Sequence, residues 1–378
     1  MRLTAIEIVL VALGIVLWTW SSIPPGSLER DWTAWHRAGD LWWKGRVAEI
    51  YPGSFDTRYP FPYPPYAINL FALFSIVPYR FAHGTAVLFS VAALGALVWC
   101  LGVAMPGRRG EYVTVSLVAI ASAPWLSTLV VGQLAALYPL LIGAGLACWA
   151  TDRRFLAGLL WGIVWVKPNI GVPFAICCLA ARQWRALLGM SVSLAALLLS
   201  TLPMGLSVWH DAYAARLRAV RECPEAISKH QTLHAFFSTT LGPGISHRGV
   251  DLLWACAVVG LLAAMLVPWW RGVSAARLPR LVGVTVLFAV ASNYYLWFYD
   301  GLLVLIPGAV WFLARDGYGS PALHALAGAL LGATFIWQHL SLFWLQGGPA
   351  LTGALLALWL VVESLDLWRA PADRTHGP

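Results

Sequence analysis

The sequence predicts an all-α polytopic membrane protein, and three observations support this fold class. Of 378 residues, 60% are hydrophobic and only 11% are charged, whereas a soluble domain carries about 25% charged residues. The excess of basic residues, a net charge of +8, is spread over short loops. A membrane helix needs about 20 apolar residues, and six stretches come close to or exceed that length: 3–20, 82–105, 186–205, 250–270, 281–299 and 349–368. We expect one membrane domain over residues 1–378, with about 11–13 spans.

The basic residues between the apolar stretches predict the topology. Cytoplasmic loops of membrane proteins are enriched in lysine and arginine. Three clusters are assigned to the cytoplasm on this rule: Arg153 with Arg154, Arg182 with Arg185, and Arg271 with Arg277 and Arg280. Three regions then face outward, namely residues 21–61, residues 206–248 and the short turn around 293–300, and the tail 370–378 lies inside. This distribution leaves no basic surface for DNA or RNA.

Two details of this topology stay open. Arg108 and Arg109 would lie outside if 62–79 were a full span, so either this segment re-enters the membrane or the loop departs from the rule. The N-terminal run lacks the small-residue cleavage site of a signal peptide. An uncleaved first helix is therefore expected over 3–20.

The first outward loop contains a charged, aromatic helix, predicted over residues 31–46. Asp31 opens this segment and can cap the first turn. Asp40 and Lys44 are spaced for an ion pair on one face. Apolar residues recur at helical spacing on another face, at Trp35, Ala38, Leu41 and Trp42. This pattern favours a helix that lies in the membrane interface.

A proline-rich segment follows, "RYPFPYPPYAINLF". Its four closely spaced prolines prevent a helix before Pro65, which suits a first helical turn. The tyrosines in and beside this segment either form an interfacial belt or stack on a sugar ring: Tyr59, Tyr63 and Tyr66.

Isolated polar residues lie at the expected outer ends of three other apolar runs. Gln133 and Asp300 each have a structural alternative, as a helix-packing amide and as a helix N-cap. Lys167 is the strongest candidate, because the apolar stretches around it, of about 12 and 14 residues, are short for spans. Instead of snorkelling, we expect Lys167 to line an outward cavity, where its charge suits a phosphate.

The second outward loop carries a polar cluster before an apolar helix, at Lys229, His230, Gln231 and His234. The spacing of His230 and His234 makes a zinc site worth considering. A third ligand and the glutamate of an "HEXXH" motif are missing nearby. We expect no metal and, because no nucleotide-binding fingerprint is convincing, no cofactor.

Taken in order, these motifs resemble glycosyltransferase family 87, also known as the DUF2029 family, within the GT-C class of membrane glycosyltransferases. The resemblance covers about residues 1–310. Its motifs are matched by Asp31, Ala38, Gly45 and Tyr51; by Phe61 to Pro65; by Gly132 and Gln133; by Ala157, Gly158, Lys167 and Pro168 ahead of "RQWRA"; by His230 to Leu233; and by Ser292, Asn293, Tyr299 and Asp300. The sequence departs from the family pattern at His230, Thr232 and Asn293.

The resemblance implies a GT-C fold and a mannosyltransferase that uses a polyprenyl-phosphate donor. The acceptor would be a lipid or glycan on the outer face of a bacterial cytoplasmic membrane, and the reaction would invert the anomeric configuration. Asp31 would be the catalytic base, and Lys167 would bind the donor phosphate. Further substrate contacts are expected from Tyr63, Gln133, His230, Gln231, Tyr299 and Asp300. Two alternatives remain: a transporter or lipid flippase that uses the same charged residues, and another lipid-carrier enzyme such as a glycan ligase.

Overall fold

A computed structural model describes residues 31–51, 61, 63–107, 109–205, 209, 213–214, 230–294, 296–343 and 351–369. Every regular element in these ranges is helical, as the fold class predicts. Several expectations fall outside the described residues: the first helix over 3–20, the start of the first outward loop, most of 206–229 and the cytoplasmic tail 370–378.

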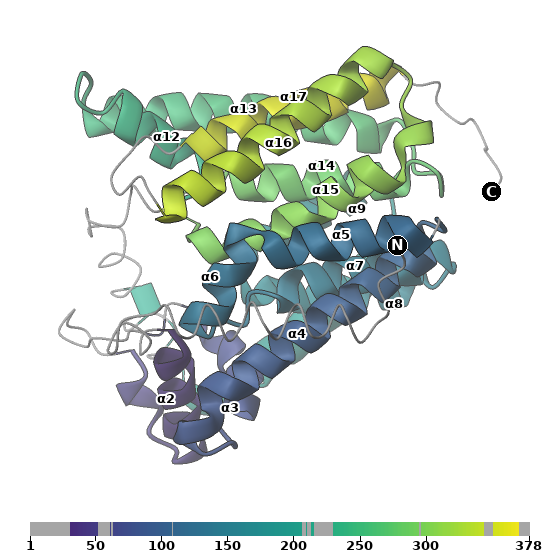
Figure 1. The fold of residues 1–378 in the computed structure, drawn as a ribbon. Helices are drawn as coiled ribbons and strands as arrows, with labels where there is room; N and C mark the ends of the chain where they lie inside the picture. The colour runs from purple at the N-terminus through teal and green to yellow at the C-terminus, as the bar shows by residue number, and fades with distance from the viewer. Residues whose placement is uncertain are drawn as a thin grey trace.

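The helices form a layered bundle, with α2 (Asp31–Trp43) and α3 (Ile68–Phe74) packed together at one end (Figure 1). The first half of the chain continues with α4 (Tyr79–Ala104), α5 (Arg109–Ala121), α6 (Ala123–Val131), α7 (Leu137–Ala150), α8 (Arg154–Ile163), η3 (Val164–Val166), α9 (Pro168–Ala180) and α10 (Trp184–Leu199). The second half holds α12 (Leu233–Thr240), α13 (His247–Trp270), α14 (Leu278–Ala291), η7 (Phe298–Val304), α15 (Leu305–Leu313), α16 (Pro321–Phe343) and α17 (Leu351–Arg369). Short 3-10 turns complete the described chain: η1 (Val47–Glu49), η2 (Pro65–Ala67), η4 (Leu202–Met204) and η8 (Arg315–Gly317).

The described part of the chain contains fewer helices long enough to cross a membrane than the 11 to 13 spans expected of the whole chain. Within the described residues, four qualify by length and composition, and a fifth does if α5 and α6 form one span bent by 56°. Six further apolar helices have only 10–17 residues. The difference has a local cause, because helix breaks divide the apolar runs at Ser122, at Gly132 and at Lys167–Pro168.

The segment 62–79 does not form a full span. Its described part holds only η2 and α3, which pack against α2. Tyr79 then begins α4, a helix of 26 residues that is long enough to cross the membrane. If α4 crosses the membrane, Tyr79 and Arg109 lie on opposite sides, and the conflict with the positive-inside rule does not arise.

The charged helix of the first loop ends at Trp43, three residues before the predicted end. Gly45 adopts a left-handed conformation with φ of 70°. The N–H of Arg46 donates to the carbonyl of Leu41 over 2.9 Å, and that of Gly45 donates to Trp42 over 3.0 Å. These two bonds form a Schellman motif, which ends a helix at a left-handed glycine. The predicted Asp40–Lys44 ion pair is confirmed at 2.7 Å.

Helix α14 forms the centre of the bundle. All of its residues are buried, and it contacts α9, α13, α15 and α17. The longer helices on the periphery expose large apolar side chains, such as Leu88 on α4 and Val259 on α13. A helix that is apolar all round belongs in the interior, whereas an exposed apolar surface suits contact with lipid.

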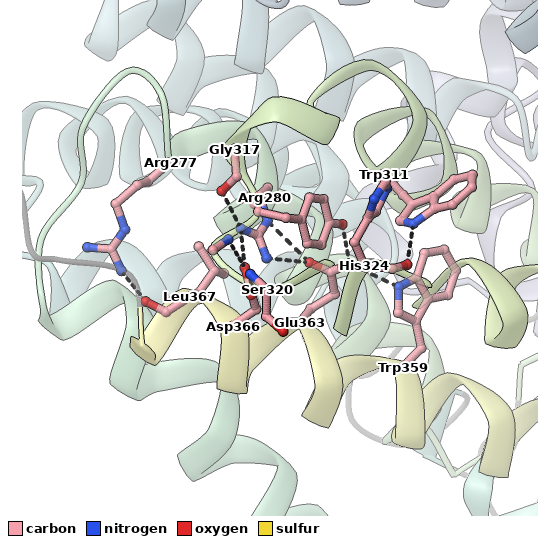
Figure 2. Close-up of polar contacts among 12 residues, drawn as sticks. Arg277, Arg280, Trp311, Gly317, Ser320, His324, Trp359, Glu363, Asp366 and Leu367 are labelled. Carbon is pink, nitrogen blue, oxygen red and sulfur yellow. Dashed lines mark hydrogen bonds and ion pairs between the residues drawn. The ribbon is translucent and has the colours of Figure 1, made fainter. Parts of the chain in front are cut away.

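At its N-terminal end, α14 is joined to α17 through Arg280 (Figure 2). The guanidinium lies 3.0 Å from Glu363 Oε2 and 2.9 Å from Asp366 Oδ2, and all three side chains are buried. The same carboxylates accept hydrogen bonds from Tyr318, Trp359 and the backbone N–H groups of Gly319 and Ser320. The buried carboxylates of Glu363 and Asp366 therefore have hydrogen-bond donors in addition to Arg280. This cluster acts as a structural anchor that holds α17 against α14.

Candidate active site

A buried ion pair lies at the break between η3 and α9. Lys167 occupies this break, and its ammonium contacts the carboxylate of Asp300 at the start of η7. The Lys167 side chain is 13% exposed and that of Asp300 is 1% exposed. A buried ion pair contributes little net stability, because desolvation offsets its attraction. Unlike the Arg280 cluster, whose carboxylates have several further donors, the Lys167 ammonium contacts one carboxylate among the described residues, which makes this pair the stronger candidate for function.

Three tyrosine rings surround the Lys167 ammonium. Its Nζ lies 5.6 Å from the ring centroid of Tyr63, 5.1 Å from that of Tyr138 and 5.5 Å from that of Tyr299. Cations are attracted to aromatic faces within about 6 Å. The rings hold the ammonium in place while leaving its N–H groups for oxygen acceptors.

Gln133 connects two of these tyrosines. The Tyr63 hydroxyl donates to Gln133 Oε1 over 3.2 Å, and Gln133 Nε2 donates to the Tyr299 hydroxyl over 3.2 Å. The amide is 4% exposed, so the two bonds satisfy a buried polar group. The sequence left open whether Gln133 packs helices together or contacts substrate. Its two hydrogen bonds join separate segments beside Lys167, so the two interpretations are compatible.

The glycine before Gln133 explains how the amide reaches this position. Gly132 ends α6 with φ of 65°. A Cβ at Gly132 would lie 2.7 Å from His83 Cδ2 and 2.9 Å from Trp32 Cβ. The carbonyl of Gly132 accepts a hydrogen bond from Trp35 Nε1 over 3.0 Å. Only glycine fits this crowded left-handed turn, which aims the next side chain inward.

The proline-rich segment positions Tyr63. Pro65 begins η2, as the sequence predicts, and the Tyr63 carbonyl accepts a hydrogen bond from the Tyr51 hydroxyl over 2.7 Å. The Tyr63 ring packs on Phe61 and Phe71. Tyr63 is buried beside Lys167, so it is not part of an exposed interfacial belt.

The polar residues before α12 are attached to the segment that leads into Asp300. The N–H of Gln231 donates to the carbonyl of Leu296 over 3.0 Å, and the His230 ring meets the Trp297 ring edge-on at 5.4 Å. Gln231 Oε1 is buried without a hydrogen-bond partner among the described residues. Burial, with a smaller effect of His234, lowers the pKa of His230 to about 4, so its imidazole is neutral near pH 7.

His234 belongs to a separate cluster. Its Nε2 lies 3.1 Å from Asp251 Oδ1, which also accepts a hydrogen bond from the Tyr294 hydroxyl over 3.3 Å. The rings of His234 and Tyr294 stack at 3.8 Å. Within the described part of the chain, no three His, Cys, Asp or Glu side chains gather closely enough to hold a metal ion.

Asp31 is the first residue of α2, and its side chain is not among those described. The next residue, Trp32, touches the Gly132 turn, and Trp35 is hydrogen-bonded to it. The start of α2 is thereby fixed beside the turn that carries Gln133.

Sequence reasoning missed two features of the site. It did not include Tyr138, although this tyrosine follows Gln133 closely in the same run. It also did not pair Lys167 with Asp300, although both are isolated charges at the expected outer ends of apolar runs.

Comparison with known families gives one match. The sequence matches the family described as glycosyltransferase family 87 over residues 61–293, which is more than half of the chain. The chain belongs to glycosyltransferase family 87. A search of curated proteins gives no match.

Membership of family 87 confirms the resemblance found in the sequence. It identifies a membrane glycosyltransferase, an enzyme that needs a sugar donor and an acceptor, and so decides against a transporter or flippase. The match begins just before Tyr63, includes Gln133, Lys167 and Gln231, and stops shortly before Asp300. Asp31 precedes it.

Proposed function

We propose that this family 87 enzyme transfers mannose from a polyprenyl-phosphate donor to a lipid or glycan acceptor. Transfer would take place at the outer face of a bacterial cytoplasmic membrane and invert the anomeric configuration. The observation that carries this proposal is the Lys167 ammonium, which lies at a helix break among apolar helices and is surrounded by three tyrosine rings.

The geometry of Lys167 suits a lipid-linked phosphate. An ammonium has three N–H donors, and Asp300 accepts from one of them, so two can be offered to phosphate oxygens. Lys167 also precedes α9, a helix of 13 residues whose N-terminal end favours a negative charge. Asp300 then holds the ammonium in position while the phosphate binds.

The neighbouring helices support an outward-facing site. The segments 154–166 and 168–180 each have 13 residues, or about 20 Å of helix, which is shorter than the roughly 30 Å hydrocarbon core. Their distant ends lie beside the arginine clusters at 153–154 and 182–185. If those arginines face the cytoplasm, Lys167 lies below the outer surface, within reach of a lipid headgroup.

The reaction is a single displacement. The acceptor hydroxyl oxygen attacks the anomeric carbon of mannose, and the bond from that carbon to the phosphate oxygen breaks. The bonding electrons leave with polyprenyl phosphate, whose growing charge Lys167 stabilises. Asp31 takes the proton of the acceptor hydroxyl, a step typically worth 10²–10⁴-fold in rate. One displacement inverts the configuration and requires no second carboxylate as nucleophile.

The remaining polar residues are assigned to the sugar and the acceptor. Gln133, Tyr63 and Tyr299 form a hydrogen-bonded row beside Lys167, and a sugar ring can stack on such aromatic faces. Gln231 offers an amide oxygen that has no partner among the described residues. His230, being neutral, can exchange hydrogen bonds with sugar hydroxyls without adding charge.

The test is an incubation of purified protein with radiolabelled polyprenyl-phosphate-mannose and a set of acceptor lipids and glycans. Donors that carry glucose, galactose or arabinose on the same polyprenyl phosphate are run in parallel. Label that moves from the mannose donor to an acceptor supports the proposal. Transfer of another sugar alone would correct the donor sugar, and activity only with a nucleotide sugar would refute the lipid-phosphate donor.

A further inference from the structure

A concave site adjoins η7, the element that carries Asp300. This apolar cavity is formed by α5, by the break before α6, by η7 with α15, and by α16. Gly301, the residue after Asp300, forms part of its wall. Because Gly301 has no side chain, the cavity comes within one residue of the ion pair.

Among the residues that line the cavity, Gln338 has a buried polar atom without a hydrogen-bond partner in the described part of the chain. Thr114, Ser122 and Thr334 also line it, but each hydroxyl donates to a carbonyl of its own helix or turn. Gln338 is 3% exposed, and its Nε2 has no hydrogen-bond partner among the described residues. A buried donor left without an acceptor costs about as much as a lost hydrogen bond, so a ligand oxygen is expected there.

The amide lies beside Gly301 in the cavity wall. A Cβ on Gly301 would lie 2.8 Å from Gln338 Nε2, so the amide rests against the Gly301 backbone. The α5 wall faces outward, because Val118 is 47% exposed and Thr114 is also exposed. If α5 and α6 form one membrane span, these exposed residues face the bilayer, and a ligand can enter the cavity from the lipid.

We propose that this cavity binds an acyl chain of an ester-linked membrane phospholipid, with the ester carbonyl accepting a hydrogen bond from Gln338 Nε2. The apolar lining suits the hydrocarbon, and the carbonyl supplies the missing acceptor. A polyprenyl phosphate whose phosphate lies at Lys167 would place only hydrocarbon beside Gln338 and would leave the amide unpaired. The preference for a phospholipid over polyprenyl phosphate rests on the phosphate-binding role proposed for Lys167, whereas the labelling experiment tests the cavity directly.

The experiment uses the full-length protein in nanodiscs that contain a phospholipid with a diazirine in its acyl chain. After illumination, mass spectrometry locates the labelled peptides. Unlabelled competitors are a diacyl phospholipid, its dialkyl ether analogue with the same headgroup, and polyprenyl phosphate. Gln338→Leu removes the donor, Gly308→Leu fills the cavity without removing a polar group, and Gln183→Leu is the matched control. Thermal unfolding verifies that each variant is folded.

We expect label in the peptides of α5, α15 and α16. The diacyl lipid should compete roughly 2- to 12-fold better than the ether analogue, the effect of one hydrogen bond. Gln338→Leu should abolish this preference, Gly308→Leu should reduce labelling, and Gln183→Leu and Lys167→Met should change neither. Label without enrichment in these peptides, equal competition by the ester and ether lipids, or competition by polyprenyl phosphate alone would each overturn the proposal.

Discussion

Lys167 and Asp300 form an ion pair although 133 residues of sequence separate them. The pair joins the break before α9 to the start of η7, and Tyr63, Tyr138 and Tyr299 enclose the ammonium. Removing one partner of a buried pair leaves an uncompensated charge, typically at a cost of about 3–5 kcal/mol. Tests of this pair must therefore separate folding from donor binding.

Lys167→Met should weaken donor binding more than acceptor binding and should also lower the melting temperature. The double variant Lys167→Met/Asp300→Asn removes both charges, so it should recover most of the stability without recovering donor affinity. Thermal unfolding and polyprenyl-phosphate binding are measured on both proteins. If the double variant binds polyprenyl phosphate as tightly as wild type, the lysine serves only the fold.

Asp31→Asn should lower turnover at least about 10²-fold while leaving expression and melting temperature unchanged. Asparagine keeps the size and the helix-capping ability of aspartate but cannot accept the proton. The matched control is Asp40→Asn on the same helix, whose exposed pair with Lys44 contributes little. Wild-type turnover in the Asp31 variant would disprove its role as base.

Gln231→Ala should lower activity by roughly 5- to 150-fold, because sugar hydroxyls left unpaired cost about 1–3 kcal/mol. The backbone bond to Leu296 does not involve the side chain and should survive the substitution. The effect is expected in binding, hence in KM, and should be smaller than that of Asp31→Asn. Gln183→Ala is the control, and equal activity of the two variants would remove Gln231 from the site.

Gly132→Ala and Gly45→Ala separate backbone strain from crowding. Both glycines have positive φ, and alanine in this conformation costs about 1–2 kcal/mol. A Cβ at Gly45 meets nothing within 4 Å, whereas one at Gly132 collides with His83 and Trp32, which should add about 1–3 kcal/mol. We expect Gly132→Ala to lower the melting temperature further and to impair activity by displacing Gln133. Equal shifts in the two variants would contradict this account of the turn.

The sequence predicted those features that depend on local pattern. Helical periodicity predicted the helix that begins at Asp31, and the proline-rich segment predicted the helical turn that begins at Pro65. Single polar residues within apolar runs identified Gln133 and Lys167 as candidates. Contacts between distant segments, such as Lys167 with Asp300, are set by how the helices pack, and a periodic pattern does not specify them. The described residues contain fewer long helices than expected, because short breaks, such as those at Ser122 and Gly132, leave the composition almost unchanged.

Acid should destabilise the protein through His230. The pKa is about 4 in the folded state, below the ordinary value of 6.5, so between these two pH values the unfolded chain binds a proton that the native state does not. This contribution to stability is complete above pH 6.5 and falls as the pH drops towards 4, by up to about 3 kcal/mol. His230→Asn should flatten the pH dependence of the melting temperature over this range, and an unchanged slope would contradict the buried, neutral imidazole.

Product analysis of a single turnover tests the central claim most directly. Purified enzyme in excess is mixed with polyprenyl-phosphate-mannose and an acceptor, and mass spectrometry quantifies both products. The account predicts that polyprenyl phosphate and mannosylated acceptor appear in equal amounts, with an inverted anomeric bond, and that Asp31→Asn forms almost none of either. Release of polyprenyl phosphate without a mannosylated acceptor, or retention of the anomeric configuration, would contradict it.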